Sequence, residues 1–149
     1  MRIWIDADAC PKAIKEVLFR AAERMQIKTT LVANHHLPTP PSKVITARQV
    51  PAGFDVADDA ILVSMEPGDL VITADIPLAD QVIRKGGSAL NPRGTLYTPE
   101  NVKDHLSRRD MMEDLRGSGM MTGGPSPLAK KDVQVFANAL DRFLARHGG

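Results

Sequence analysis

The chain has 149 residues, 43% of them hydrophobic and 25% charged, which is typical of one soluble globular domain with a buried core. A single cysteine excludes an internal disulfide framework, and the net charge of +1 gives no overall attraction to nucleic acid. The sequence shows neither a signal segment nor an apolar run of about 18 residues. We therefore expect a cytoplasmic protein that does not enter a membrane, while the oligomeric state stays open.

The first third of the chain reads as strand, helix and two further strands. Ile3–Ile5 is a short apolar run typical of a buried parallel strand, and Pro11–Met25 has apolar residues at helical spacing. Lys28–Ala33 is rich in β-branched residues and predicts a second strand. The proline-rich segment Asn34–Ser42 interrupts regular structure, and Val44–Val50 predicts a third, weaker strand.

The middle of the chain repeats this alternation. Helical spacing returns in Phe54–Met65, and Asp69–Asp75 is a second strong apolar strand that ends in a carboxylate. Ile76–Arg84 predicts a short helix, which the pair Gly86-Gly87 ends. The side of the first of these helices that we expect to be buried consists of Val56, Ala57, Ala60, Ile61 and Val63.

The last third predicts two short strands and two longer helices. Ser88–Asn91 and Thr95–Tyr97 flank a Pro-Arg-Gly turn, and helices are expected over Glu100–Arg116 and Leu128–Arg146, joined by a Gly/Ser/Met/Pro segment. The last helix carries an apolar stripe that we expect to pack on the body of the protein. The stripe consists of Val135, Phe136, Ala139, Leu140, Phe143 and Leu144.

The alternation of strands and helices predicts an α/β fold of three layers, α/β/α, around a parallel sheet. We expect residues 1–149 to form a single domain, with residues 99–149 as a C-terminal helical extension packed on it.

Carboxylates follow both strong strands. Asp6 and Asp8 come directly after the first strand, and Asp75 ends the other. If these strands are neighbours, their carboxyl ends meet at a switch point, where open α/β sheets bind ligands. For Asp8 the alternative is that it caps the following helix, and Asp6 could be a solvated strand end.

Further acids stand in the next two helices. Asp55, Asp58 and Asp59 share one helical face, and Asp80 lies one turn into the following helix. Several carboxylates without a His–Cys cluster suit a hard cation, Mg²⁺ or Mn²⁺. Acids in a first turn also favour the helix dipole without any other function, and Asp59 is the one most expected to face solvent.

Other chemistries find less support in the sequence. Cys10 has no His–acid pair near it in sequence, and the pair His35-His36 lacks the further ligands of a zinc site. No dinucleotide fingerprint follows a strand. The Gly123–Pro125 segment could offer amides to a phosphate, although a flexible connector is the interpretation that the sequence favours.

Motifs along nearly the whole chain resemble the bacterial YaiI/YqxD family. The segments that carry the resemblance are Asp6–Pro11, Phe54–Ile61, Val71–Ala79, Leu90–Gly94, Leu115–Gly117, Gly123–Pro125 and Lys131–Phe136.

That family looks like a distant branch of the PIN-like superfamily, whose members are often metal-dependent ribonucleases. The resemblance implies a central parallel sheet ordered 3-2-1-4-5, with two C-terminal helices here. It also implies metal ligands at Asp6, at Asp55 or Asp58, and at Asp75, with Asp8 and Asp80 as additions.

We therefore expect a Mg²⁺- or Mn²⁺-dependent phosphodiesterase or ribonuclease, possible substrates being RNA or another phosphodiester, with Asp6, Asp55, Asp58 and Asp75 as catalytic residues. Alternatives are a non-catalytic nucleic-acid or protein-binding module on the same fold, or a hydrolase of small phosphoesters. Basic residues in the second half are candidates for phosphate contacts. They are Arg84, Lys85, Arg93, Arg108, Arg109, Arg116, Lys130 and Lys131.

Overall fold

The computed structural model describes residues 1–53, 56–104 and 129–147. These residues form a six-stranded sheet in the order β3-β2-β1-β4-β5-β6, which confirms the expected core order 3-2-1-4-5 and adds one strand at its edge. The first five strands are parallel, and β6 pairs antiparallel with β5 in the expected hairpin. The strands are β1 (Ile3–Asp6), β2 (Thr29–Ala33), β3 (Ile45–Gln49), β4 (Leu70–Ile72), β5 (Ser88–Leu90) and β6 (Leu96–Tyr97).

Helices connect the strands close to the expected positions. They are η1 (Ala7–Ala9), a short 3-10 turn, α1 (Lys12–Met25), α2 (Val56–Ser64), α3 (Ile76–Arg84) and α5 (Lys130–His147). Residues 99–104 are also helical, and the remainder of the helix expected over Glu100–Arg116 lies outside the described residues. Within the described ranges no helix is long and apolar enough to cross a membrane.

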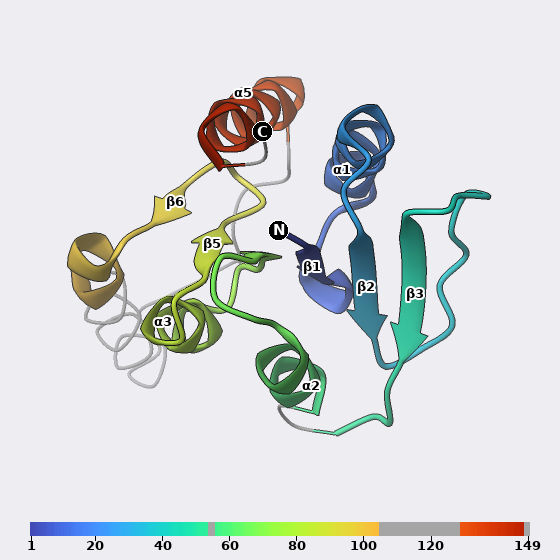
Figure 1. The fold of residues 1–149 in the computed structure, drawn as a ribbon, viewed down its shortest axis with the longest axis horizontal. Helices are drawn as coiled ribbons and strands as arrows, with labels where there is room; N and C mark the ends of the chain where they lie inside the picture. Colours follow the sequence, from blue (N-terminus) through green and yellow to red (C-terminus); the bar gives the residue numbers. More distant parts are fainter. Residues whose placement is uncertain (54–55, 105–128, 148–149) are drawn as a thin grey trace, which may run out of the picture.

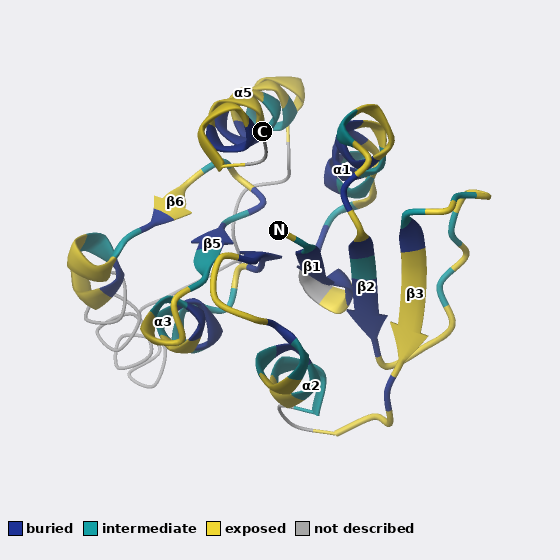
Figure 2. Cartoon of the chain, in the orientation of Figure 1, coloured by how far each residue is buried: buried dark blue, intermediate teal, exposed yellow. Residues whose placement is uncertain are grey.

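Two hydrophobic cores lie on the two faces of the sheet, which confirms the three-layer architecture. Helices α1 and α5 cover one face, and α2 and α3 cover the other (Figure 1). Because side chains alternate along a strand, Ile3 and Ile5 enter the core under α1 and α5, whereas Trp4 enters the core under α2 and α3. Figure 2 shows the buried sides of α1, α3 and α5 turned toward the sheet, whereas α2 is mostly of intermediate burial.

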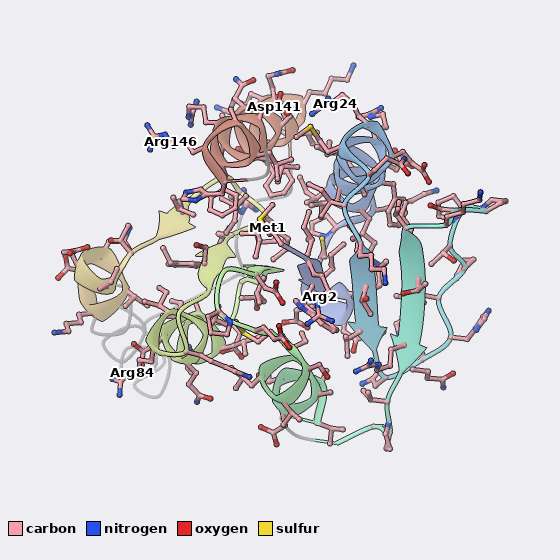
Figure 3. All side chains as sticks on the ribbon, viewed as in Figure 1. Met1, Arg2, Arg24, Arg84, Asp141 and Arg146 are labelled. Carbon is pink, nitrogen blue, oxygen red and sulfur yellow. The ribbon has the colours of Figure 1, made fainter. Side chains whose placement is uncertain are left out.

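Helix α5 is part of the main core. Phe136 and Leu140 are fully buried together with Ile3 and Ile5, although more than a hundred residues separate them in sequence. At the surface of the same contact, Arg24 of α1 and Asp141 of α5 form an ion pair of 3.0 Å, and the two lie side by side in Figure 3. The apolar stripe is therefore confirmed as a packing face, except for Val135, which is 49% exposed.

The buried side expected for α2 is wrong at Val63. This residue is 83% exposed, whereas Ile61 is fully buried. Two residues that are two positions apart differ by about 200° around a helix and cannot share a face. Ile61 is the residue that reaches the core against the sheet.

Asp69 ties the start of β4 to the start of β1 at the amino edge of the sheet. Its carboxylate, only 4% exposed, accepts hydrogen bonds from Arg2 N, Trp4 Nε1 and Glu66 N at 3.0, 3.1 and 3.0 Å. Burial raises the pKa of Asp69, but these hydrogen bonds and the charge of Arg2 outweigh burial and hold the pKa below its usual value. The Arg2 and Arg48 guanidiniums lie over the Trp4 ring, 5.2 and 5.7 Å from its centroid.

Candidate functional site

Polar side chains follow four neighbouring strands at the carboxyl edge of the sheet. Asp6 ends β1, while Asn34, Thr73 and Asn91 come directly after β2, β4 and β5. The chain order reverses between β1 and β4, since β2 and β3 lie to one side of β1 and the later strands lie beyond β4. This edge is therefore the switch point at which open α/β sheets form ligand sites.

Thr73 joins the two central strands at this edge. Its hydroxyl donates to Asp6 Oδ2 at 3.0 Å and accepts from Asp75 N at 3.0 Å. The Asp75 side chain caps α3, because its Oδ1 accepts from Leu78 N at 2.9 Å. The structure thus brings Asp6 and Asp75 together, as the sequence predicts, through a threonine that the sequence analysis did not single out.

One oxygen of each carboxylate has no hydrogen-bond donor among the described residues, and we call these two atoms the open oxygens. Asp6 Oδ1 and Asp75 Oδ2 accept no hydrogen bond from any described residue. Asp6 as a residue is 7% exposed, and Asp75 is half-buried. Burial raises the pKa of Asp6, and the nearby charges of Asp75 and Asp8 raise it further against the effect of the Thr73 hydrogen bond.

Asp8 links β1 to the end of β2. It lies in η1, where its Oδ2 accepts from Asn34 N at 3.0 Å and its Oδ1 lies 3.0 Å from His35 Nδ1. Helix α1 begins instead after Pro11, with no side-chain cap. The interpretation of Asp8 as a helix cap is therefore wrong, because the 3-10 turn directs Asp8 toward the neighbouring strand.

Tyr97 and Asn91 form a further part of this edge that the sequence analysis missed. Asn91 Nδ2 donates to Tyr97 Oη at 2.8 Å, and Asn91 Oδ1 accepts from Arg93 N at 2.7 Å. Burial raises the pKa of Tyr97, and the charge of Asp75 raises it further, which places the phenol near that carboxylate. The Asn-Pro-Arg-Gly turn was the available signal, since Asn often bonds the amide two residues on.

The remaining predicted acids take different positions. Asp58 is half-buried on α2, Asp59 is exposed there, and Asp55 lies outside the described residues. Asp80 pairs with Arg84 at 3.1 Å, one turn apart on α3. The charge of Asp80 is therefore compensated by that of Arg84.

Those predicted phosphate contacts that the structure describes do not gather at the carboxyl edge. Arg84 and Lys85 lie at the end of α3 (Figure 3). The next residue, Gly86, accepts a hydrogen bond from Gly68 N, which precedes β4. This end of α3 is therefore at the amino edge of the sheet, opposite the candidate site. Arg93 does lie at the edge and contacts Asp132 of α5 at 3.4 Å. Lys130 and Lys131 are exposed at the start of α5. Arg108, Arg109 and Arg116 lie outside the described residues.

The described residues fit a divalent cation held by few protein ligands. Within them no group of three or more His, Cys, Asp or Glu side chains is arranged to hold a metal ion. Mg²⁺, however, commonly binds through one or two carboxylates and completes its shell with water and substrate phosphates. The open oxygens of Asp6 and Asp75 match that kind of site. The two carboxylates are close enough for the charge of Asp75 to raise the pKa of Asp6.

Cys10 is poorly suited to nucleophilic chemistry. Burial raises the pKa of its thiol to about 12, and the charge of Asp6 adds to this against the effect of Lys15. A thiolate is therefore scarce at neutral pH. The Gly123–Pro125 segment lies outside the described residues.

The fold and this edge define an α/β protein with a carboxylate-bearing site at the switch point of a parallel sheet. Residues 4–146 match the model of a family described as an uncharacterised bacterial family, YaiI/YqxD. The chain belongs to the YaiI/YqxD family, as its motifs predict.

Curated relatives match nearly the whole chain. The UPF0178 protein of Shewanella amazonensis is 64% identical over 146 residues, covering 98% of this chain and 98% of the relative. That of Janthinobacterium sp. (strain Marseille) is 61% identical, covering 98% and 97%. The UPF0178 protein ECA0873 of Pectobacterium atrosepticum is 60% identical, covering 97% and 96%. No solved structure matches the chain.

Proposed function

We propose that the protein is a Mg²⁺- or Mn²⁺-dependent phosphodiesterase that acts on RNA or a related phosphodiester. The observation that carries the proposal is the pair of open oxygens, Asp6 Oδ1 and Asp75 Oδ2, which accept no hydrogen bond from a described residue and lie at the ends of the two central strands. Thr73 sets their relative position through one hydroxyl, which bonds both residues. Such an arrangement favours a hard cation that substrate phosphate can also reach.

In this proposal each described group has a physical role. A bound cation would polarise the phosphoryl oxygen and lower the pKa of a bound water. Asp6 and Asp75 would hold that cation, and Thr73 would keep Asp6 from turning away. Asp8 is held by Asn34 N and His35, so it would act on the approach to the site rather than as a ligand.

The direct test is metal-dependent cleavage by purified protein. Single-stranded RNA, single-stranded DNA and bis(p-nitrophenyl) phosphate are each incubated with Mn²⁺ or with EDTA. We expect cleavage with Mn²⁺ and none with EDTA. Asp75→Asn should remove cleavage and leave the fold intact, because Asn is as good a helix cap as Asp.

Asp80→Asn is the matched control, since it removes one carboxylate from the same helix but one that is paired with Arg84. It should keep the wild-type cleavage rate. Equal cleavage by the wild type and Asp75→Asn would identify a contaminating nuclease and contradict the proposal.

A second candidate is a non-catalytic nucleic-acid-binding module. It is favoured by the finding that no three-ligand metal group occurs among the described residues. RNA binding that persists in EDTA, with no cleavage under any metal condition, would select this function. Cleavage of small phosphoesters with no action on polymers would instead indicate a small-phosphoester hydrolase.

A further inference from the structure

A small cavity lies between the β5–β6 hairpin and α5, away from the open carboxylates. Its volume is about 220 Å³. The lining residues that matter here are Gly94, Leu96, Arg142, Phe143, Arg146 and His147. No acidic side chain is among the described residues that line it.

The cavity carries two arginines that form no ion pair with an acidic side chain in the described part of the chain. Arg142 and Arg146 are four residues apart on α5, so they lie on the same face of the helix. Neither forms an ion pair with a described residue, and Asp141, which precedes Arg142, is paired with Arg24 of α1 (Figure 3). Two guanidiniums at one hollow favour a phosphate, since their planar donors match its oxygens.

An aromatic pair lies beside the two arginines. The His147 ring packs on Phe143 with their centroids 4.5 Å apart, and His147 is exposed while Phe143 is buried. Exposed rings of this kind are platforms on which nucleobases stack. The cavity thus combines groups that bind phosphate with a ring that can accept a base.

The β5–β6 hairpin connects this cavity to the acidic edge. Gly94 and Leu96 line the cavity, whereas Asn91 and Tyr97 of the same hairpin face the side of Asp75. Gly94 packs directly on α5, because a Cβ built there would lie 2.7 Å from Val135 Cγ1. The hairpin, packed on α5, therefore lies between the cavity and the acidic edge.

We propose that the cavity bounded by Arg142, Arg146 and His147 binds a nucleotide, with its phosphate on the two arginines and its base on His147. This inference rests on the proposed function in one respect. If the protein cleaves a nucleic-acid strand, the cavity would hold a nucleotide next to the phosphodiester that is cleaved. A free mononucleotide has the same chemistry as a nucleotide in a strand.

The helix dipole alone does not explain these cations. Cations are favoured in the last turn of a helix, which accounts for Arg146 and His147. Arg142 precedes that turn, and the dipole requires neither a hollow nor an aromatic pair.

The test measures binding in EDTA, so that it is independent of metal and of cleavage. Fluorescently labelled 12-mers of single-stranded RNA and DNA are titrated with the full-length protein by anisotropy at several salt concentrations, and AMP is titrated by calorimetry. The variants are Arg142→Ala/Arg146→Ala and, as a control with the same change in charge, Arg20→Ala/Lys28→Ala, whose side chains are exposed elsewhere.

We expect the Arg142→Ala/Arg146→Ala variant to bind at least tenfold more weakly and the control to stay within twofold of the wild type. For the 12-mers, the magnitude of the negative slope of log Kobs against log salt should decrease by about 0.7, because the variant loses one phosphate contact and each such contact on a single strand contributes about 0.7. Binding of the 12-mers without AMP identifies a strand as the source, and binding of AMP identifies the free nucleotide. Each of these results supports the site.

Absence of binding to every probe at low salt would overturn the inference, as would an equal loss in the two double variants. Neither result bears on the proposed function, which is measured separately by Mn²⁺-dependent cleavage of RNA, single-stranded DNA and bis(p-nitrophenyl) phosphate. Absence of Mn²⁺-dependent cleavage by the wild type, with AMP or 12-mer binding in EDTA that Arg142→Ala/Arg146→Ala weakens, would contradict the proposed function and still support this site.

Discussion

The Thr73 hydroxyl donates a hydrogen bond to Asp6 Oδ2 at 3.0 Å and so joins the ends of β1 and β4. Asp6 is 7% exposed and Thr73 is 1% exposed, so a partner lost here is not simply replaced by bulk water. The same hydroxyl accepts from Asp75 N. One side chain therefore contacts both aspartates of the candidate site, the carboxylate of Asp6 and the backbone amide of Asp75.

Replacing this threonine should destabilise the protein. Thr73→Val keeps the shape but removes both bonds, and hydrogen bonds to charged groups contribute about 1.5–3 kcal/mol. We expect a loss of about that size in the free energy of unfolding, measured by urea denaturation at pH 7. Thr46→Val on the exposed strand β3 is the control and should change the free energy by less than about 0.5 kcal/mol. Equal effects of the two changes would show that the Thr73 hydroxyl is not specifically required.

Asp69 should make stability fall on the acid side. Its pKa is lowered in the folded protein, so its contribution is complete above the pKa of the unfolded chain, about 3.9. The contribution is lost as the pH falls through the lower folded value. Asp69→Asn should therefore be destabilised at pH 7 by about 1.5–3 kcal/mol through its broken hydrogen bonds, and the gap to wild type should narrow toward pH 3.

Urea unfolding of both proteins at pH 7, 5 and 3 measures this gap. Asp59→Asn, at an exposed position on α2, is the control, and its difference from the wild type in free energy of unfolding should change little among the three pH values. A gap for Asp69→Asn that is constant across the three pH values would contradict the role assigned to the Asp69 charge.

Helix α5 should be required for the stability of the whole chain. Leu140 is fully buried in the core that also contains Ile3 and Ile5 of β1, and Leu→Ala changes in cores cost about 2–5 kcal/mol. We expect Leu140→Ala to lower the free energy of unfolding within that range in a single transition. Val135→Ala, on the same helix but 49% exposed, should cost much less. A separate early transition for α5 would mean that this helix is an appendage rather than part of the core.

Comparing Gly94 with Gly68 distinguishes the cost of a left-handed backbone from the cost of a steric clash when each glycine is replaced by alanine. Gly94 and Gly68 have φ of +97° and +93°, but a Cβ would meet Val135 at Gly94 and nothing within 4 Å at Gly68. Both Gly→Ala changes should cost about 1–2 kcal/mol for the left-handed backbone. Gly94→Ala should cost about 1–3 kcal/mol more, because the hairpin must move off α5. Thermal unfolding of the two variants compares them, and equal costs would contradict the close packing of the hairpin on α5.

Much of the architecture could be predicted from local pattern. The apolar runs at β1 and β4, the helical spacing after each, and the family resemblance indicate the sheet order that is observed. The ranges of α3 and α1 agree closely because clear signals end them, such as the glycine pair after Arg84. Val63 was misplaced because α2 has so many apolar residues that composition did not define a single buried face.

The candidate site was less predictable because its contacts depend on register. Asp6 and Asp75 are visible as acids at strand ends, but Thr73 becomes important only once β1 and β4 are paired. The partners of Asp8 come from the end of β2, and a 3-10 turn that sequence spacing does not reveal brings them within reach. In sequence, Arg142 and Arg146 are typical of a solvated helix face. Only the structure shows that the hairpin forms the other side of a cavity beside them.

The measurement that tests the central claim most directly is calorimetric titration of Mn²⁺ into the wild type, Asp75→Asn and Asp80→Asn. The open oxygens of Asp6 and Asp75 predict saturable binding in the wild type and in Asp80→Asn, and loss of binding in Asp75→Asn. Binding that is unchanged in Asp75→Asn, or no binding to the wild type at millimolar metal, would contradict a metal site at the ends of β1 and β4.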